Sequence, residues 1–135
     1  MSFLTSRGIG VLAERMGIEF SEFSAERAVA RMPVEGNTQP IGLLHGGAYV
    51  VLGETMGSMC ANFHAEEGKV AVGIEINASH TASATSGYVV GTCEAIHLGR
   101  TLTVHQISIH NDQGALCSTV RITNYIVDSR VKVKS

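Results

Sequence analysis

The sequence is poor in charged residues, and its basic residues form no cluster. Aspartate, glutamate, lysine and arginine make up 16% of the 135 residues, and the formal net charge is −2. Binding to nucleic acid requires a basic stripe or patch, so we exclude nucleic acid as a partner. Hydrophobic residues make up 44% of the chain. We therefore expect one domain, spanning residues 1–135, that covers part of its apolar surface by forming a homo-oligomer.

Targeting segments and metal-binding motifs are also missing. The chain does not open with a basic region and an apolar run, and it has no window of about 18 uncharged apolar residues. We therefore expect no signal peptide, no membrane partner and a cytoplasmic location. The cysteines are odd in number and lie in apolar or alternating segments: Cys60, Cys93 and Cys117. This pattern favours buried free thiols over disulfides. Neither the cysteines nor the histidines have the spacing of metal ligands, so we expect no metal and no cofactor.

Hydrophobic periodicity predicts an α+β domain. Alternating residues predict two short strands, 17–23 and 27–33, joined by a hairpin turn. An apolar segment then predicts a long helix from Gly46 to about His64. The remaining alternation predicts four long strands, at 69–80, 87–97, 100–110 and 115–127. We expect the sheet to wrap around the helix and its open edges to be protected in a dimer.

Three further segments have weaker patterns. Residues 3–15 predict a short helical lead-in, and residues 129–135 predict a frayed tail. The alternation slips within 100–110, where Leu102 and Val104 share one face while Ile107 and Ile109 share the other. A β-bulge or a strong twist in that strand would account for the slip.

The predicted central helix carries one charge and two glycines. From residue 48 to residue 63 the only charged side chain is that of Glu54. A glutamate in mid-helix usually points to solvent or pairs with an arginine. Here its neighbours on the helix are small or apolar, which favours a functional carboxylate. Ser58 follows at i+4, where its hydroxyl can share a hydrogen bond or a water with Glu54. Gly53 and Gly57 are unfavourable in a helix and predict close approach of the sheet or of a substrate.

The start of this helix offers a second group of candidates. The glycines after His45 either ease the turn into the helix or let a ligand approach the unpaired N–H groups at its positive end. In the second case the Gly46 N–H would stabilise a carbonyl oxygen that becomes negative. The side chains of Gln39 and His45 could hydrogen-bond a carbonyl or a water. His80, at the end of strand 69–80, is either a structural or solvated residue or a member of the same site.

Four segments together resemble the hotdog-fold acyl-CoA thioesterases. They are Gln39-Pro-Ile-Gly-Leu-Leu-His45-Gly-Gly-Ala, Glu54-Thr-Met-Gly-Ser58, Gly73-Ile-Glu-Ile-Asn-Ala-Ser-His80 and His97-Leu-Gly-Arg100. The likeness covers about residues 17–127. It is strongest to the branch that acts on aromatic acyl thioesters, which includes the enterobactin proofreading, menaquinone-pathway and 4-hydroxybenzoyl-CoA thioesterases. It implies a hotdog fold and hydrolysis of an acyl-CoA or acyl-carrier thioester to an acid and a thiol.

The resemblance also implies roles for the candidate residues. Glu54 would be the general base or the nucleophile, and Ser58 would position the water. The Gly46 N–H, assisted by Gln39 or His45, would polarise the carbonyl. Two subunits would share each active site, with Glu54 from one and the carbonyl-binding groups from its partner, and two dimers would form a homotetramer.

Substrate contacts follow from the same resemblance. His80 would contact a hydroxyl of the acyl group, and Arg100 would bind a phosphate. CoA or phosphopantetheine would run along a longer set of residues: Gly73, Thr81, Ala82, Ser83, His97, Leu98, Gly99, Arg100, Thr101 and Leu102.

One departure from the family pattern concerns the nucleotide end of CoA. Relatives often have a basic residue and a proline after the position of His80, whereas this chain has Thr81, Ala82 and Ser83. A phosphate contact is therefore missing, which favours a carrier-protein thioester. Other functions stay open: a non-catalytic module that binds acyl thioesters, a medium-chain acyl-CoA thioesterase, or an enzyme of the phenylacetate-pathway type. Members of that last type typically have aspartate at the position of Glu54.

Overall fold

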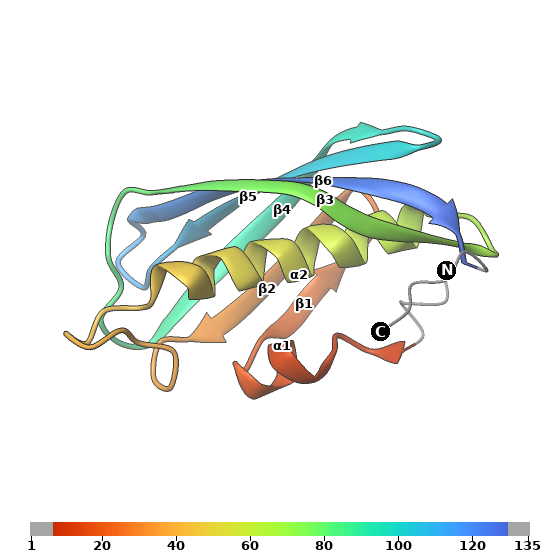
Figure 1. Ribbon diagram of the computed structural model, residues 1–135. Coiled ribbons are helices and arrows are strands. Elements are labelled where there is room, and N and C mark those ends of the chain that lie inside the picture. The colour runs from red at the N-terminus through yellow and green to blue at the C-terminus, as the bar shows by residue number, and fades with distance from the viewer. Residues whose placement is uncertain (1–6, 130–135) are drawn as a thin grey trace.

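The computed structural model describes residues 7–129, which form one antiparallel sheet and two helices (Figure 1). The elements follow in the order α1 (Val11–Arg15), β1 (Glu19–Phe23), β2 (Arg27–Pro33), α2 (Gly46–His64), β3 (Lys69–His80), β4 (Tyr88–Leu98), β5 (Leu102–His110) and β6 (Leu116–Asp128). The strand order in the sheet is β1-β2-β4-β5-β6-β3. The predicted bounds of the helix 46–64 and of the strands 27–33 and 69–80 are confirmed, and the other strands differ by one or two residues. The predictions for residues 1–6 and 130–135 lie outside the described residues.

The long helix α2 lies along one face of the sheet (Figure 1) and contacts every strand from β2 to β6. Its two interior glycines mark the closest approach. A Cβ added at Gly53 would lie 2.6 Å from Cγ1 of Val120, and one added at Gly57 would lie 2.3 Å from Cγ2 of Ile122. Two glycines in the helix are therefore explained by the sheet rather than by a substrate, because no larger side chain fits between α2 and β6.

The irregularity expected in the strand 100–110 occurs in its pairings with β4 and β6 and not in its own alternation. In β5 the residues Thr103, His105, Ile107 and Ile109 are all buried and all lie on the face towards the core. The alternation is therefore regular, and it looked broken because two of the core positions hold polar side chains. The pairing of β5 with β4 shifts between residues 95 and 97 of β4. Its pairing with β6 shifts between residues 109 and 110 of β5, which pair with residues 118 and 116.

The two edges of the sheet differ. The edge strand β1 has 5 residues and carries the ion pair between Arg31 and Glu19 (2.9 Å). The edge strand β3 has 12 residues, and among the described residues it pairs on one side only, with β6. Ile74 of β3 is 57% exposed. A long, apolar and open edge is a surface that native proteins usually cover.

Two further predictions can be compared with the fold. All three cysteines are buried and free, as predicted. Within residues 7–129, neither helix is long and apolar enough to cross a membrane.

Candidate active site

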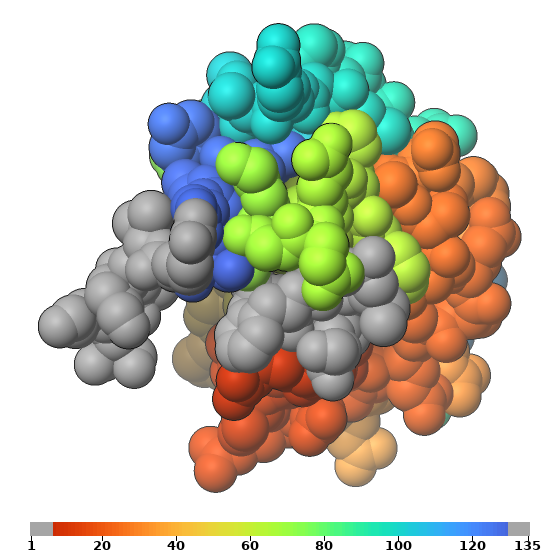
Figure 2. Space-filling view, turned by 90° about the vertical axis from the view of Figure 1, so that its right-hand side faces the viewer, coloured from red at the N-terminus to blue at the C-terminus, as the bar shows by residue number. Residues whose placement is uncertain are grey.

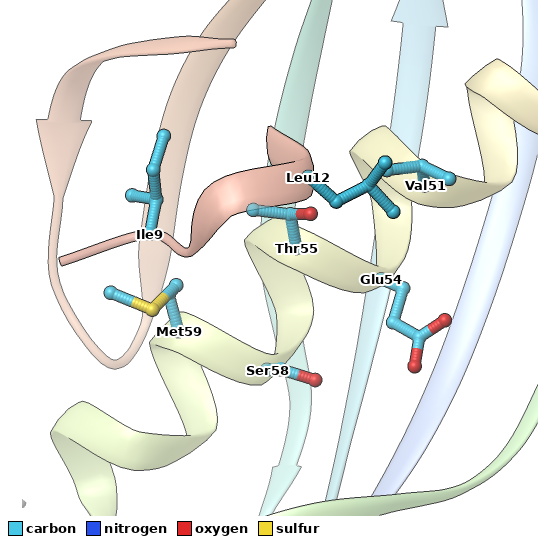
Figure 3. A pocket seen from close by; sticks show the side chains of 7 residues that line it. All are labelled: Ile9, Leu12, Val51, Glu54, Thr55, Ser58 and Met59. Carbon is cyan, nitrogen blue, oxygen red and sulfur yellow. The ribbon is translucent and has the colours of Figure 1, made fainter. Parts of the chain in front are cut away.

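Glu54 lies on α2 and lines an open pocket of about 350 Å³ (Figure 3). The lining comes from α2 and from the segment around α1: Ile9, Leu12, Val51, Glu54, Thr55, Ser58 and Met59. The carboxylate is exposed in the single chain, and no arginine or lysine of the described chain forms an ion pair with it. The site thus combines apolar walls, two hydroxyl groups and one accessible carboxylate, a composition typical of small-molecule sites.

The carboxylate of Glu54 faces the middle of the edge strand β3. A Cβ added at Gly73 would lie 3.5 Å from Oε2 of Glu54 and 3.7 Å from Oδ1 of Asn124. Gly73 stands at a register shift in the pairing of β3 with β6. The absence of a side chain at Gly73 therefore leaves room for a third group between the carboxylate and Asn124.

Ser58 lies one turn after Glu54 and projects from the same side of α2 (Figure 3). Its Oγ donates a hydrogen bond of 3.2 Å to Oδ1 of Asn124 on β6, and not to Glu54 as the spacing suggested. The lone pairs of the Ser58 hydroxyl stay available to accept a hydrogen bond from a water. Asn124 is a residue that sequence reasoning missed. The sequence does contain a signal for Asn124. It is a polar residue at an inward-facing position of β6, and the residues two positions before and after it are buried and apolar.

A second group of candidates lies at the N-terminus of α2. His45 is the N-cap, and its Nδ1 accepts a hydrogen bond of 2.8 Å from the Gly47 N–H. Nε2 is therefore the protonated nitrogen of the neutral ring. The Gly46 N–H finds no acceptor within the described chain. Helix geometry leaves this N–H unpaired at the positive end of the helix dipole, where it can bind a partly negative oxygen.

His80 lies beside this helix start in the same chain. A Cβ added at Gly46 would be 3.1 Å from Nε2 of His80. The orientation of the His80 ring is fixed on its Nδ1 side, where Nδ1 shares a hydrogen bond of 2.9 Å with the hydroxyl of Ser118. It also lies 5.1 Å from the ring of Tyr49. The fold therefore joins His80 to the Gly46 group and not to Glu54.

Gln39 lies in the loop that precedes α2. Its side-chain oxygen accepts a hydrogen bond of 2.6 Å from the Ile41 N–H. The oxygen is thus occupied within the loop, and the amide NH₂ is the group left to donate to a ligand.

The two groups of candidates are separated within one chain. Gly46 and Glu54 are eight residues apart on the same helix, which corresponds to about 12 Å along its axis at 1.5 Å per residue. One carbonyl group cannot reach both the Gly46 N–H and the Glu54 carboxylate over that distance. A single chain therefore contains two halves of the expected site rather than one whole site.

The residues expected to contact CoA are also divided. Thr81, Ala82 and Ser83 follow the end of β3, where the Thr81 hydroxyl donates to the carbonyl of Leu116 (2.8 Å). His97, Leu98, Gly99, Arg100, Thr101 and Leu102 form the β4–β5 hairpin at the other end of the sheet. The strand β6 pairs with both regions: its residue 118 lies opposite the end of β3, and its residue 125 lies opposite Leu102 at the start of β5. Seven residues along a strand correspond to about 24 Å, which is the separation of the two regions within one chain.

Comparisons with known proteins identify the family of the chain. The family model of the thioesterase superfamily matches residues 41–118. The proofreading thioesterase EntH of Cronobacter turicensis is 40% identical over 125 residues, covering 92% of this chain and 91% of the relative. The 1,4-dihydroxy-2-naphthoyl-CoA hydrolase of Escherichia coli is 42% identical over 125 residues, covering 92% of both chains.

A solved thioesterase from Haemophilus influenzae superposes with a TM-score of 0.87 at 36% identity, covering 97% of this chain and 92% of that one. The family match spans more than half of the chain, and the relatives span nearly all of it. The chain therefore belongs to the thioesterase superfamily, has the hotdog fold and is a thioester hydrolase.

Proposed function

We propose that the protein hydrolyses aromatic acyl thioesters of CoA or of a carrier protein, with Glu54 as the catalytic carboxylate. The observation that supports this most is the position of Glu54, which is accessible, lacks a basic partner in the described chain and lines an apolar pocket. A carboxylate in such a place is free to take a proton from water or to attack a carbonyl carbon.

The second half of the site comes, in this proposal, from another copy of the chain. Pairing the open edge of β3 with the same edge of a second subunit about a two-fold axis would extend the sheet and cover Ile74. The two α2 helices would then run antiparallel. That arrangement brings the Gly46 N–H of one protomer towards Glu54 of its partner, which removes the separation present within one chain.

The proposed reaction begins with a water held between Glu54 and Ser58. The Ser58 hydroxyl donates its hydrogen bond to Oδ1 of Asn124 and accepts a hydrogen bond from the water, which orients a lone pair of the water towards the thioester. Glu54 takes the other proton of the water as the water oxygen bonds to the carbonyl carbon. The Gly46 N–H stabilises the oxyanion, assisted by Gln39 or His45. The tetrahedral intermediate then collapses and the C–S bond breaks. Glu54 returns its proton to the leaving thiolate, and the acid is released.

A covalent route uses the same residues. Glu54 attacks the carbonyl carbon directly, the thiol leaves, and water hydrolyses the mixed anhydride. A single turnover in ¹⁸O-labelled water can reveal the covalent route. Label in the side chain of Glu54 after that turnover indicates an anhydride hydrolysed at the Glu54 carboxyl carbon, whereas label only in the product acid is expected both for general-base catalysis and for an anhydride hydrolysed at the acyl carbon.

The preference for an aromatic acyl group rests on the pocket and on one relative. The pocket beside Glu54 has apolar walls from Ile9, Leu12, Val51 and Met59, which suit a flat ring. The E. coli relative is named for a dihydroxylated aromatic acyl-CoA. In the dimer, His80 would contact a hydroxyl of such a group from the partner's side.

The proposal also assigns the thiol arm, the assembly and the location. The arm would pass Gly73 and the β4–β5 hairpin of one protomer, with Arg100 on a phosphate, and residues 81–83 of the other. The outer face of the sheet exposes Tyr88 and Val90 (37% and 40%), which favours a dimer of dimers. Three buried free thiols fit a reducing cytoplasm.

The test compares Glu54→Gln with Glu67→Gln, a matched change at an exposed carboxylate in the turn between α2 and β3. We expect Glu54→Gln to lower kcat by about 10²–10⁴-fold with an unchanged Tm, and Glu67→Gln to retain activity. The substrates are hydroxybenzoyl-CoA, phenylacetyl-CoA, a medium-chain acyl-CoA and a hydroxybenzoyl-carrier protein, with thiol release as the readout. Near-wild-type turnover by Glu54→Gln would refute the catalytic role, and equal rates on all acyl groups would refute the aromatic preference.

The same panel tests His80. His80→Ala should reduce kcat/KM for hydroxybenzoyl-CoA more than for the medium-chain substrate, because only the acyl group of the former has a hydroxyl that His80 can contact. Ser118→Ala is the control, because it removes the hydrogen bond that holds the His80 ring and so shows the effect of displacing the ring without removing it. Equal losses on both substrates would exclude His80 from acyl recognition.

A further inference from the structure

A second cluster of reactive side chains lies in the core, outside the pocket of Glu54. It consists of Cys60 on α2, Cys93 on β4 and His105 on β5, each with 0% exposure. The two Sγ atoms and one ring nitrogen all lie within 4.8 Å of one another. The residues are far apart in sequence, so their spacing resembles no metal motif, and we expected none.

The hydrogen bonds of His105 leave one nitrogen without a partner. Nε2–H donates to the carbonyl of Ala25 at 2.9 Å, so Nδ1 carries the free lone pair of a neutral ring. Nδ1 is buried and has no hydrogen-bond partner among the described residues. A neutral imidazole whose other nitrogen is held by a carbonyl is the usual form of a metal-binding histidine.

The two sulfur atoms complete the donor set. Thiolates and imidazole are the ligands that soft metal ions such as Cu⁺ and Zn²⁺ prefer. Three atoms within 4.8 Å of one another have a common point no more than about 2.8 Å from each, and metal–sulfur and metal–nitrogen bonds need about 2.3 and 2.0 Å. Inward movement by up to about 0.5 Å for each sulfur and about 0.8 Å for the nitrogen would close that gap.

We propose that Cys60, Cys93 and His105 form a buried site for a soft metal ion, and that Cu⁺ suits the site best. Zn²⁺ usually takes four ligands, and within residues 7–129 no fourth cysteine, histidine or carboxylate joins the group. Cu⁺ is stable with three. When Cu⁺ binds, one thiol releases its proton to solvent, and the resulting thiolate balances the charge of the ion. The site then carries no net charge, as an apolar core requires.

The position of the cluster indicates a structural role. It would tie the C-terminal part of α2 to β4 and β5. Figure 2 shows this end of the molecule, where the end of α2 lies between the β4–β5 hairpin and the β1–β2 segment. His64 of α2 donates to the carbonyl of Gly99 in that hairpin at 2.8 Å. Because the donors are sealed from solvent, we expect the ion to enter during folding and to resist chelators afterwards.

The experiment refolds the full chain anaerobically, after unfolding in chelator and reductant, with Cu⁺, with Zn²⁺ or with neither. Metal content is measured after gel filtration, and circular dichroism checks the fold. We expect about one Cu⁺ per chain in the wild type and in Cys117→Ala, which removes a buried thiol outside the cluster. Cys60→Ala and Cys93→Ala should each lower the content at least tenfold. If the wild type retains Zn²⁺ instead, and the Zn²⁺ content falls in the same variants, the result would support the site and identify Zn²⁺ as its ion.

Two results would overturn the proposal. One is a natively folded wild type that retains neither ion, including one in which mass spectrometry finds a Cys60–Cys93 disulfide instead. The other is metal content that both alanine variants preserve. If neither variant folds, X-ray absorption on the metal-loaded wild type decides: a shell of sulfur and nitrogen supports the site, and a shell of oxygen alone refutes it.

Discussion

The hydroxyl of Ser58 donates a hydrogen bond of 3.2 Å to the side-chain oxygen of Asn124, which joins the proposed water-binding residue of α2 to the buried face of β6. The second polar atom of Asn124, Nδ2, is buried and has no partner within the described chain. The contact with Ser58 is therefore the hydrogen bond through which Asn124 acts, and its role in turnover can be separated from its role in stability.

We expect Asn124→Leu to lower kcat about fivefold, because a hydrogen bond that orients Ser58 contributes about 1 kcal/mol. The cost in stability should be small, since leucine has a similar size and removes an unpaired donor. Ser58→Ala should give a similar loss, and the double variant should lose no more than either single one. Effects that multiply would show that the two residues act independently.

A change at Gly46 tests the backbone N–H directly. Proline at the first position of a helix removes that N–H without breaking the helix, and the extended backbone of His45 (ψ 135°) is compatible with a following proline. Gly46→Ala is the matched control, because its Cβ meets His80 at the same place and its N–H remains. We expect Gly46→Pro to reduce kcat about 10²–10³-fold beyond Gly46→Ala. Equal activities would exclude the N–H as the oxyanion donor.

The elements of the fold could be predicted because apolar residues determine them. The helix 46–64 is apolar on nearly every side, and its bounds follow from His45-Gly46-Gly47 at one end and Gly68 beyond the other. Polar residues inside the core were misread for the same reason. Thr103 and His105 occupy inward positions of β5. The hydrophobic pattern of the sequence is therefore interrupted at these residues, although the alternation of buried and exposed positions is regular.

The site could be predicted as residue types but not as an arrangement. His45, Gly46 and Glu54 were identified from their place on one helix. Their separation along that helix follows only from its geometry, which shows that they cannot meet within one chain. Asn124 and the cluster around His105 were missed because each depends on contacts between distant strands, which spacing along the sequence does not record.

Gly57→Ala should destabilise the fold. Alanine is the better helix former by about 1 kcal/mol, but its Cβ would lie 2.3 Å from Cγ2 of Ile122, and overpacking of this kind costs about 1–3 kcal/mol. We therefore expect a lower urea midpoint at fixed protein concentration. In the Gly57→Ala background, Ile122→Ala should cost less than it does in the wild type, because the new methyl group fills part of the cavity. A midpoint that rises in the single variant would contradict the close packing.

Mixed dimers test whether two chains share each site. Glu54→Gln and Gly46→Pro damage opposite halves of the proposed site, so each variant alone should be nearly inactive. A heterodimer of the two would contain one site with both changes and one site with neither. After random re-association of equal amounts, half of the dimers are mixed, so we expect about a quarter of the wild-type activity to return.

The matched control for this experiment is a mixture of Glu54→Gln with Glu54→Ala, in which every site lacks the carboxylate and no activity should return. Recovery in the first mixture and none in the second would require Glu54 and Gly46 to act from different chains. Absence of recovery in both, with subunit exchange verified by differently tagged chains, would place catalysis within a single chain. That outcome is hard to reconcile with two groups that lie about 12 Å apart on one rigid helix.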